Sequence, residues 1–284
     1  MPFTLIKGTF HVVHYQADGD SIRFLADDPA NWTKLGGSAL KLKPGECAQL
    51  RVEAIDTLET HYAPGGHGTT FHQPTEFAQA ATLFLIDGLG IKNVKFGPAG
   101  REIVSADDGT HGYILARKTD CFNRPISFVF AGDARGADGA AVTLGPKGLE
   151  RSLNFQAAAA GLAYPTYYEG LFPDLRRKIT RAVTAARKAN LGLWPQDKTI
   201  TGAAVPDLSA VTTNDVILPK LFRRIVDYLE QSGSIQGFKE HLAQHPERVT
   251  DVKTGHFTNL DTFVQVQGDQ VRLTIEPERL VFRE

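Results

Sequence analysis

Short stretches of alternating apolar and polar residues dominate the first half of the chain and constrain its fold most. Residues 9–15 and 21–25 alternate on either side of Asp18-Gly19-Asp20, a pattern typical of two strands joined by an Asp-Gly turn. Further strands are expected at 39–43, 47–55, 93–96, 101–105, 112–118 and 125–131. The apolar residues of 76–85 recur every three or four positions, which predicts a helix. We therefore expect short strands, able to close into a barrel, with a helix between them.

The second half of the chain has a different pattern. Helices are expected at 149–161, 173–190, 216–231 and 234–244, followed by strands at 256–266 and 270–275. A polar stretch rich in Pro, Thr and Ala precedes the last two helices and resembles a linker. The sequence therefore predicts a main domain over 1–198, a linker over 199–213 and a small helix-helix-hairpin appendage over 214–284, whose role the sequence leaves open.

Composition and charge limit the classes of protein to consider. The chain is 42% hydrophobic and 22% charged, as in ordinary globular proteins. It has no apolar run near the roughly 18 residues of a membrane span and no signal-peptide pattern at its start. We expect a cytoplasmic protein as written, or a secreted one if a leader was removed, with no membrane partner. The net charge of −1 means that any attraction to phosphate must be local.

Charged residues gather in three segments, each at the predicted end of a strand. The segments are Asp18-Gly19-Asp20-Ser21, Arg51 to Thr60 and Thr119 to Arg124. Carboxylates that converge there suit a hard cation, which prefers oxygen ligands. Phosphodiester hydrolysis needs such a cation, a base to orient water, and positive groups near the charge that develops on the phosphate. The candidates for these tasks are Asp20, Asp56, Glu59, Arg51 and Arg124.

Each segment also has an ordinary structural interpretation. Asp-Gly-Asp is common in hairpin turns, and Asp-Thr-x-Glu is common at turns and helix starts. Arg124 could be a plain surface residue. The joint occurrence of the three segments, in this order and among these strands, favours the catalytic interpretation.

The three segments resemble the active-site motifs of the staphylococcal nuclease (thermonuclease) family. Residues 18–21 are similar to the family's Asp-Gly-Asp-Thr, and Arg51 with Asp56-Thr57-Leu58-Glu59-Thr60 is similar to its Arg followed by Asp-Thr-Pro-Glu-Thr. Gly161-Leu162-Ala163 also matches a family motif. The resemblance covers about residues 8–198 and ends at Trp194 and the residues just after it.

The resemblance implies an α+β fold, with a five-stranded OB-type barrel and packed helices, and a Ca2+-dependent nuclease that leaves 3′-phosphate ends. Asp20, Asp56 and the carbonyl of Thr57 would bind one Ca2+ ion, and Glu59 would orient or deprotonate water. Two further implied roles are phosphate contacts for the catalytic Arg51 and Arg124, and a nucleotide contact for Tyr167. The implied partner is single-stranded or unwound DNA or RNA.

The chain departs from the family pattern at several positions. Leu58 replaces the usual Pro, and Cys121, Phe122 and Asn123 stand where the family commonly has Lys, Tyr and Gly. Two other interpretations stay open: a nucleic-acid-binding module of the same fold without catalysis, and a regulatory protein that acts through its C-terminal unit. DNA or RNA preference and oligomeric state are also open.

Overall fold

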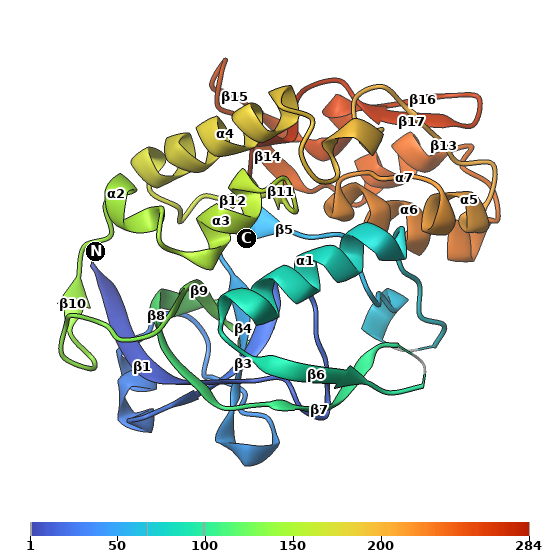
Figure 1. Ribbon diagram of the computed structural model, residues 1–284. Coiled ribbons are helices and arrows are strands. Elements are labelled where there is room, and N and C mark those ends of the chain that lie inside the picture. Colours follow the sequence, from blue (N-terminus) through green and yellow to red (C-terminus); the bar gives the residue numbers. More distant parts are fainter. Residues whose placement is uncertain (1, 67, 99, 284) are drawn as a thin grey trace. The chain divides into compact units, whose positions relative to one another are not determined.

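The computed structural model describes residues 2–66, 68–98 and 100–283 (Figure 1). The chain forms two compact units. The barrel unit contains Met1–Glu53, Ala81–Ala157 and Pro173–Lys178, and the second unit contains Ala54–Ala80, Ala158–Phe172 and Ile179–Glu284. The sequence predicts domains over 1–198 and 214–284, whereas here residues 54–80, 158–172 and 179–198 are grouped with the C-terminal part.

The barrel unit is built on a closed five-stranded barrel. Its strands are β1 (Phe3–His11), β3 (Ser21–Ala26), β4 (Ala48–Val52), β8 (Thr110–Thr119) and β9 (Pro125–Ala131). The strand order is β1-β3-β4-β9-β8, and β8 pairs back onto β1. Only the β4–β9 pair in this ring is parallel. This closed barrel with its helices is consistent with the predicted α+β, OB-like fold.

The side chains on the inner face of the strands fill the barrel. Phe10, Phe24 and Phe128 are all 0% exposed, as expected for residues on the inner face of a pleated strand. Gly8 and Gly112 are paired in the register of β1 and β8. A Cβ on Gly8 would lie 2.0 Å from a backbone oxygen of β3, and one on Gly112 would lie 2.4 Å from a backbone oxygen of β9. Glycine is therefore required at both positions.

Smaller elements complete this part of the chain. They are β2 (Tyr15–Gln16), β6 (Lys92–Phe96), β7 (Glu102–Asp107), β10 (Ala141–Val142) and the short helix α2 (Pro146–Leu149). Strands β2, β7 and β6 form a separate sheet, and β10 extends the barrel sheet beside β1. The predicted strand at 39–43 is wrong, since only Leu42 forms a bridge there, with Ala48.

Three helices include a boundary between the two units, so that each helix has residues in both. They are α1 (Thr75–Gly88), α3 (Leu153–Ala159) and α4 (Pro173–Lys188). Helices α1 and α4 agree with the predicted helices to within three residues. The single helix predicted over 149–161 is instead two short helices, α2 and α3, that are separated by a turn at 150–152.

The second unit combines short strands with three helices of its own. The helices are α5 (Leu208–Thr213), α6 (Pro219–Ser232) and α7 (Phe238–Gln244). The strands are β5 (Ile55–Asp56), β11 (Tyr164–Pro165), β12 (Tyr167–Tyr168), β13 (Ala203–Ala204), β14 (Arg248–Asp251), β15 (His256–Asn259), β16 (Val264–Gln267), β17 (Gln270–Leu273) and β18 (Leu280–Phe282). They form the pair β11-β5 and the sheets β12-β18-β14-β15 and β13-β17-β16.

The region predicted as a helix-helix-hairpin appendage holds two helices and a hairpin, but the strand predicted over 256–266 is divided into β15 and β16 by a short 3-10 helix at Leu260–Phe263. Helices α6 and α7 and the hairpin β16–β17 occupy the expected region. The segment predicted as a linker, 199–213, holds β13 and α5, and its residues Ala203, Val205 and Val211 are at most 1% exposed. This segment therefore contributes to the core of the second unit. Among the described residues, no helix has the length and apolar character that crossing a membrane requires.

A buried ion pair makes the stability of the second unit depend on pH. Asp251 is 3% exposed and accepts hydrogen bonds from Arg279 Nε (3.0 Å), Thr254 Oγ1 (2.8 Å) and the Lys253 amide (3.0 Å). The bonds from Arg279 contribute most to lowering the pKa of Asp251 from 3.8 to about 2. A carboxylate whose pKa is lower in the folded state stabilises the fold above its unfolded pKa.

We expect Asp251→Asn to lower the free energy of unfolding at pH 7 by about 2 kcal/mol. The contribution of the Asp251 charge to the free energy of unfolding is nearly complete above about pH 4, and it is lost as the pH falls through about 2. The free energies of unfolding of the wild type and the variant should therefore converge at low pH. Denaturant unfolding at pH 7, 4 and 2.5 measures this difference. A difference that stays constant over this range would mean that the charge of Asp251 does not stabilise the fold.

Candidate functional site

Three of the predicted site residues lie on or directly before neighbouring barrel strands. Arg51 of β4 is paired with Ser21 of β3 and with Ile126 of β9. Asp20 directly precedes Ser21, and Arg124 lies two residues before Ile126. This register places Asp20 level with Val52, next to Arg51, and it places Arg124 level with Gln49, two residues back from Arg51 along β4.

Asp120 fixes the direction of the Arg124 side chain. Asp120 is 2% exposed, and its Oδ2 accepts hydrogen bonds from Nε (2.9 Å) and Nη2 (2.8 Å) of Arg124. Its Oδ1 accepts from the amides of Phe122 (3.0 Å) and Arg124 (2.9 Å). Asn123, with φ of 64°, closes the turn in the left-handed region, which Asn tolerates. The role of Asp120 was not predicted from the sequence, although Asp often accepts a hydrogen bond from the backbone amide two residues later in a turn.

A groove beside Arg124 is lined by cations and one aromatic ring. It has a volume of about 410 Å³ and is lined by Lys41, Lys43, Gln49, Phe122 and Arg124. The Phe122 side chain is 71% exposed, and the guanidinium carbon of Arg124 lies 5.5 Å from its ring centroid. Guanidinium and ammonium groups bind phosphate, and an exposed ring can stack on a base. The groove therefore suits a nucleotide.

If Arg124 contacts a scissile phosphate, as the motif resemblance implies, Asp120→Asn should reduce cleavage at least about tenfold, or about 1.4 kcal/mol, because the two charge-assisted hydrogen bonds that direct Arg124 are lost. Asn can still accept the two amide hydrogen bonds, so the turn should persist. Because Asp120 would act through Arg124, Asp120→Asn should lower kcat more than it raises KM. In a protein that already carries Arg124→Ala, adding Asp120→Asn should lower the cleavage rate no further. Additive losses would contradict this positioning role.

In the second unit, Asp56 and Glu59 share a guanidinium that the sequence analysis missed. Asp56 is 6% exposed and Glu59 is 8% exposed. Arg223 of α6 donates from Nη1 and Nη2 to the two carboxylate oxygens of Asp56, at 3.1 and 2.8 Å, and also donates from Nη1 to Glu59. Burial acts to lower the pKa of Arg223, but the two carboxylates outweigh it and hold this pKa well above its usual value.

The arrangement of Asp56 and Glu59 fits a guanidinium rather than a bound Ca2+ ion. Both Asp56 oxygens accept N–H groups of Arg223, in the two-pronged geometry typical of Arg and carboxylate. Within the described ranges, no group of three or more His, Cys, Asp or Glu side chains is placed to hold a metal. Of the other two predicted ligands, Thr57 is 2% exposed beside Asp56 and Asp20 lies in the barrel unit.

The backbone at Glu59 is held by a buried glutamine. Gln73 is 0% exposed. Its Oε1 accepts from the Glu59 amide (3.2 Å), its own amide donates to the Glu59 carbonyl (2.9 Å), and its Nε2 donates to the Ile217 carbonyl (2.8 Å). Leu58, which replaces the family's Pro, is 0% exposed. It is a core residue, so the turn before Glu59 is supported by packing instead of by a proline ring.

Tyr167 lies in the core of the second unit. It is 0% exposed, and its hydroxyl shares a hydrogen bond of 2.9 Å with Thr180 Oγ1. A nucleotide could reach this ring only if the residues around it moved. The predicted contact between Tyr167 and a nucleotide therefore has no exposed surface to use in this structure.

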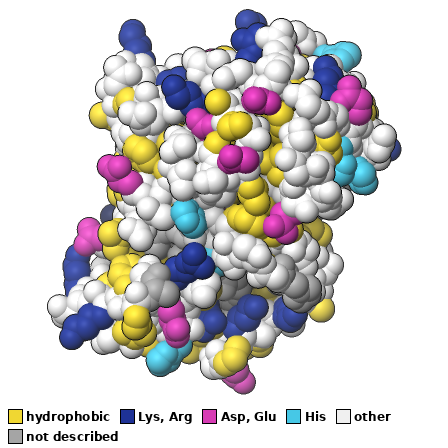
Figure 2. Space-filling view, turned by 90° about the vertical axis from the view of Figure 1, so that its right-hand side faces the viewer, with side chains coloured by type: hydrophobic (Ala, Val, Ile, Leu, Met, Phe, Trp, Pro, Cys, Tyr) yellow, Lys and Arg dark blue, Asp and Glu magenta, His cyan; other side chains and the backbone are white. Residues whose placement is uncertain are grey.

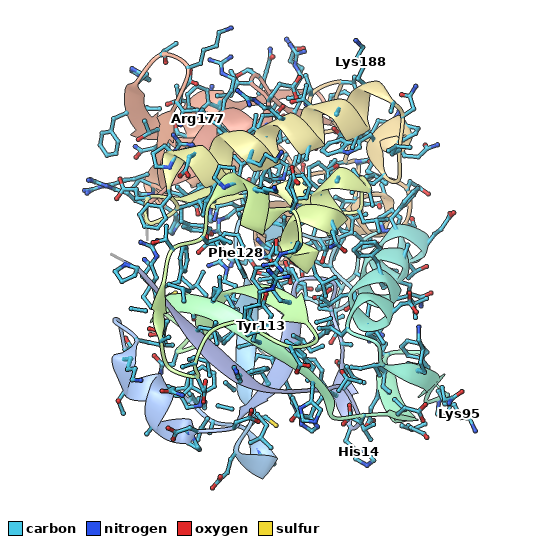
Figure 3. The ribbon with its side chains drawn as sticks, turned by 60° about the vertical axis from the view of Figure 1, so that its left-hand side comes forward. His14, Lys95, Tyr113, Phe128, Arg177 and Lys188 are labelled. Atoms are coloured by element: carbon cyan, nitrogen blue, oxygen red, sulfur yellow. The ribbon has the colours of Figure 1, made fainter. Side chains whose placement is uncertain are left out.

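Basic residues are interspersed with acidic ones on the surface. On the face shown in Figure 2, Lys and Arg side chains alternate with Asp and Glu. Figure 3 shows Arg177 and Lys188 extending from α4 into solvent. On the same helix, Lys178 pairs with Glu150, and Arg187 donates to Glu278 at 2.7 Å. The basic charge of α4 is therefore partly neutralised, and the cations beside Arg124 form the more concentrated group.

Comparison of the chain with protein-family models gives no match, and comparison with curated proteins gives none either. These comparisons therefore identify no family for the chain, and the resemblance to staphylococcal nucleases rests on the motif residues alone.

Proposed function

We propose that the chain binds DNA or RNA and hydrolyses its phosphodiester bonds, as a thermonuclease-like endonuclease. The observation that carries this proposal is the groove beside Arg124, which is lined by Lys41, Lys43 and Arg124 together with the exposed ring of Phe122. A buried carboxylate directs the Arg124 guanidinium, which reduces the reorganisation needed when phosphate binds.

The proposed roles follow the motif residues. Arg124 and Arg51 contact the scissile phosphate and stabilise the charge that develops on its oxygens. By the family resemblance, Glu59 would orient the attacking water and accept its proton, and it would have to release Arg223 to do so. Lys41, Lys43 and Phe122 hold the neighbouring phosphate and base. Ca2+ dependence and 3′-phosphate products are part of the proposal through the family resemblance, but we derive no step through a metal, because Arg223 holds the carboxylates of Asp56 and Glu59.

A second candidate function is nucleic-acid binding without cleavage. The bonds from Arg223 to Asp56 and Glu59 favour it, since they engage the groups that hydrolysis would need. In that case the cations beside Arg124 would bind the strand and the carboxylates would serve only to brace α6.

Labelled single-stranded DNA and RNA oligonucleotides, incubated with the chain in Ca2+ or in EDTA, test both candidates. The nuclease proposal expects Ca2+-dependent fragments whose mobility shifts after phosphatase treatment, because they end in phosphate. Arg124→Ala protein, purified in the same way, controls for contaminating nucleases. Fluorescence anisotropy on the same oligonucleotides separates the candidates: binding without fragments in Ca2+ supports the second candidate, and neither binding nor fragments refutes both.

A further inference from the structure

A cavity in the second unit has no part in the proposed function. Its volume is about 1030 Å³, and every residue of its lining belongs to that unit. The groove beside Arg124 shares none of these residues. Three arginines and two histidines contribute to the wall of the cavity, namely Arg224, Arg248, Arg283, His241 and His245.

Two of these arginines lie directly opposite each other on adjacent strands. Strands β14 and β18 are antiparallel with Val249 opposite Phe282, so the same register places Arg248 opposite Arg283. The Arg283 amide also donates to the Arg248 carbonyl at 3.0 Å. Val249 and Phe282 are at most 1% exposed, so they face the core and the two arginines share the other face of the sheet. Like charges at directly opposite positions destabilise a sheet.

The donors of this arginine pair are only partly used within the protein. Arg283 donates from Nε to Glu169 at 2.6 Å, which engages one of the five N–H groups of its guanidinium. Arg248 is exposed, and within the described part of the chain its side chain has no hydrogen bond or ion pair. The pair therefore has donors and positive charge to offer to an anion.

Three carboxylates also line the cavity, and two of them are balanced by nearby cations. Burial acts to raise the pKa of Glu247, but ion pairs with Lys220 and with Arg224, the latter at 3.2 Å, outweigh it and lower this pKa. Asp227 lies 3.8 Å from Arg224. The third carboxylate, Glu230, is exposed, so water and salt screen its charge. The acids of the wall therefore do not cancel the charge of the arginine pair.

The two histidines add further groups that can donate to an anion. His241 and His245 are one helical turn apart, and their ring centroids are separated by 4.4 Å. His245 Nδ1 donates to the His241 carbonyl at 3.0 Å, so Nε2 is the ring nitrogen that remains for a ligand. Burial and the neighbouring His245 lower the pKa of His241. A bound anion would raise this pKa, because it favours the charged imidazole.

We propose that this cavity binds the phosphate group of a small phosphate monoester, with Arg248 and Arg283 as its principal contacts. At pH 7 a phosphate monoester carries about 1.5 to 2 negative charges and presents three strong acceptor oxygens. Two guanidinium forks side by side suit such a group better than they suit a phosphodiester, which carries a single charge. The proposal is independent of the proposed nuclease, because it uses none of the residues assigned to cleavage.

Calorimetric titration of the full chain in EDTA with inorganic phosphate, adenosine monophosphate and adenosine tests this site. We expect both phosphate-bearing probes to bind with a dissociation constant of about 1 mM or lower, and adenosine not to bind. Arg248→Met should weaken both interactions about tenfold or more, because it removes a charge-assisted contact. Binding that is absent, or that is indifferent to Arg248, overturns the proposal.

Two control variants assign the bound phosphate to the cavity. Arg272→Met removes an exposed arginine of the same unit that donates to Gln265 at 2.7 Å and does not line the cavity, so it should leave the affinity unchanged. Arg124→Ala should also leave it unchanged. If Arg124→Ala loses phosphate binding and Arg248→Met keeps it, the phosphate lies in the groove beside Arg124 and the proposal is wrong.

A single-stranded oligonucleotide without terminal phosphates, titrated in EDTA, distinguishes a monoester from the internal phosphates of a nucleic acid. Its affinity should not depend on Arg248. An oligonucleotide that binds through Arg248 more tightly than adenosine monophosphate does would make the cavity a phosphodiester contact and contradict the proposed ligand class.

Thermal unfolding separates a ligand site from a structural role of Arg248. Without phosphate, Arg248→Met should be at least as stable as the wild type, because it removes the repulsion from Arg283. Phosphate should raise the Tm of the wild type and of Arg272→Met, but it should raise that of Arg248→Met much less. A Tm of Arg248→Met that is lower than that of the wild type by the same amount with and without phosphate would show a structural role and refute the site.

These measurements do not depend on cleavage. A chain that cuts no nucleic acid, but binds adenosine monophosphate through Arg248, would refute the proposed nuclease and retain the phosphate site. A chain that cuts nucleic acid and binds no phosphate through Arg248 would do the reverse.

Discussion

Arg124→Ala should lower the rate constant for phosphodiester cleavage at least about a hundredfold, because it removes a preorganised positive group from the developing charge. Asp120 directs this guanidinium through two of its nitrogens, at 2.9 and 2.8 Å, which makes the contact sensitive to geometry. Arg124→Lys should recover little, since an ammonium group cannot reproduce the planar fork.

Single-turnover cleavage of a short single-stranded oligonucleotide measures this effect. Arg135→Ala, at an exposed position of the same unit, is the control and should cleave like the wild type. Near-UV spectra of both variants show whether the barrel is intact. A folded Arg124→Ala protein that cleaves within a few-fold of the wild type would remove Arg124 from the phosphate, and with it the main support for the nuclease proposal.

Glu59→Gln should lower the cleavage rate constant by about 10²–10⁴-fold, the usual contribution of a general base. Gln keeps the shape of the side chain and can still accept from Arg223, so the helix contact should be weakened instead of lost. Glu76→Gln, at an exposed position near the start of α1, is the control for the loss of one negative charge.

Cleavage rate and Ca2+ affinity of Glu59→Gln should be measured on the same preparation. A large fall in rate at saturating Ca2+ supports the role of a base. A large fall in Ca2+ affinity would instead make Glu59 a metal ligand. A near-normal rate at saturating Ca2+ would leave Glu59 with the structural role that its hydrogen bonds to Arg223 and Gln73 already provide.

The barrel could be predicted from local patterns because its determinants are local. Alternation at residues 21–25 is typical of a strand with one face in the core, and the mostly apolar run at 125–131 is typical of a more fully buried strand; the structure has β3 and β9 there. Asp20 and Arg51 are neighbours in the register of β3 and β4, and Arg124 directly precedes β9, the strand on the other side of β4. This part of the candidate site needed only strand order and register.

The rest of the site depends on contacts that the sequence does not display. Arg223 lies 167 residues from Asp56, and nothing in the composition of α6 distinguishes it from Arg224 beside it. Lys41 and Lys43 lie in a loop without a regular period, so their convergence on Arg124 is set by tertiary structure. Tyr167 was placed by analogy with a family motif, and its burial follows from pairing with β18 near the far end of the chain.

Because the chain is synthesised from its N-terminus, residues 54–80 leave the ribosome well before most of the second unit to which they belong. Residues 54–80 belong to this unit, yet the partner that fixes Gln73 is Ile217, which is 144 residues later. At roughly 5–20 residues per second, a ribosome needs on the order of 7–30 s to make that interval. During this time Leu58 has no complete core to enter, and Arg223 has not yet been made to pair with Asp56 and Glu59. A nascent chain is therefore expected to present this segment to chaperones until α6 has left the ribosome.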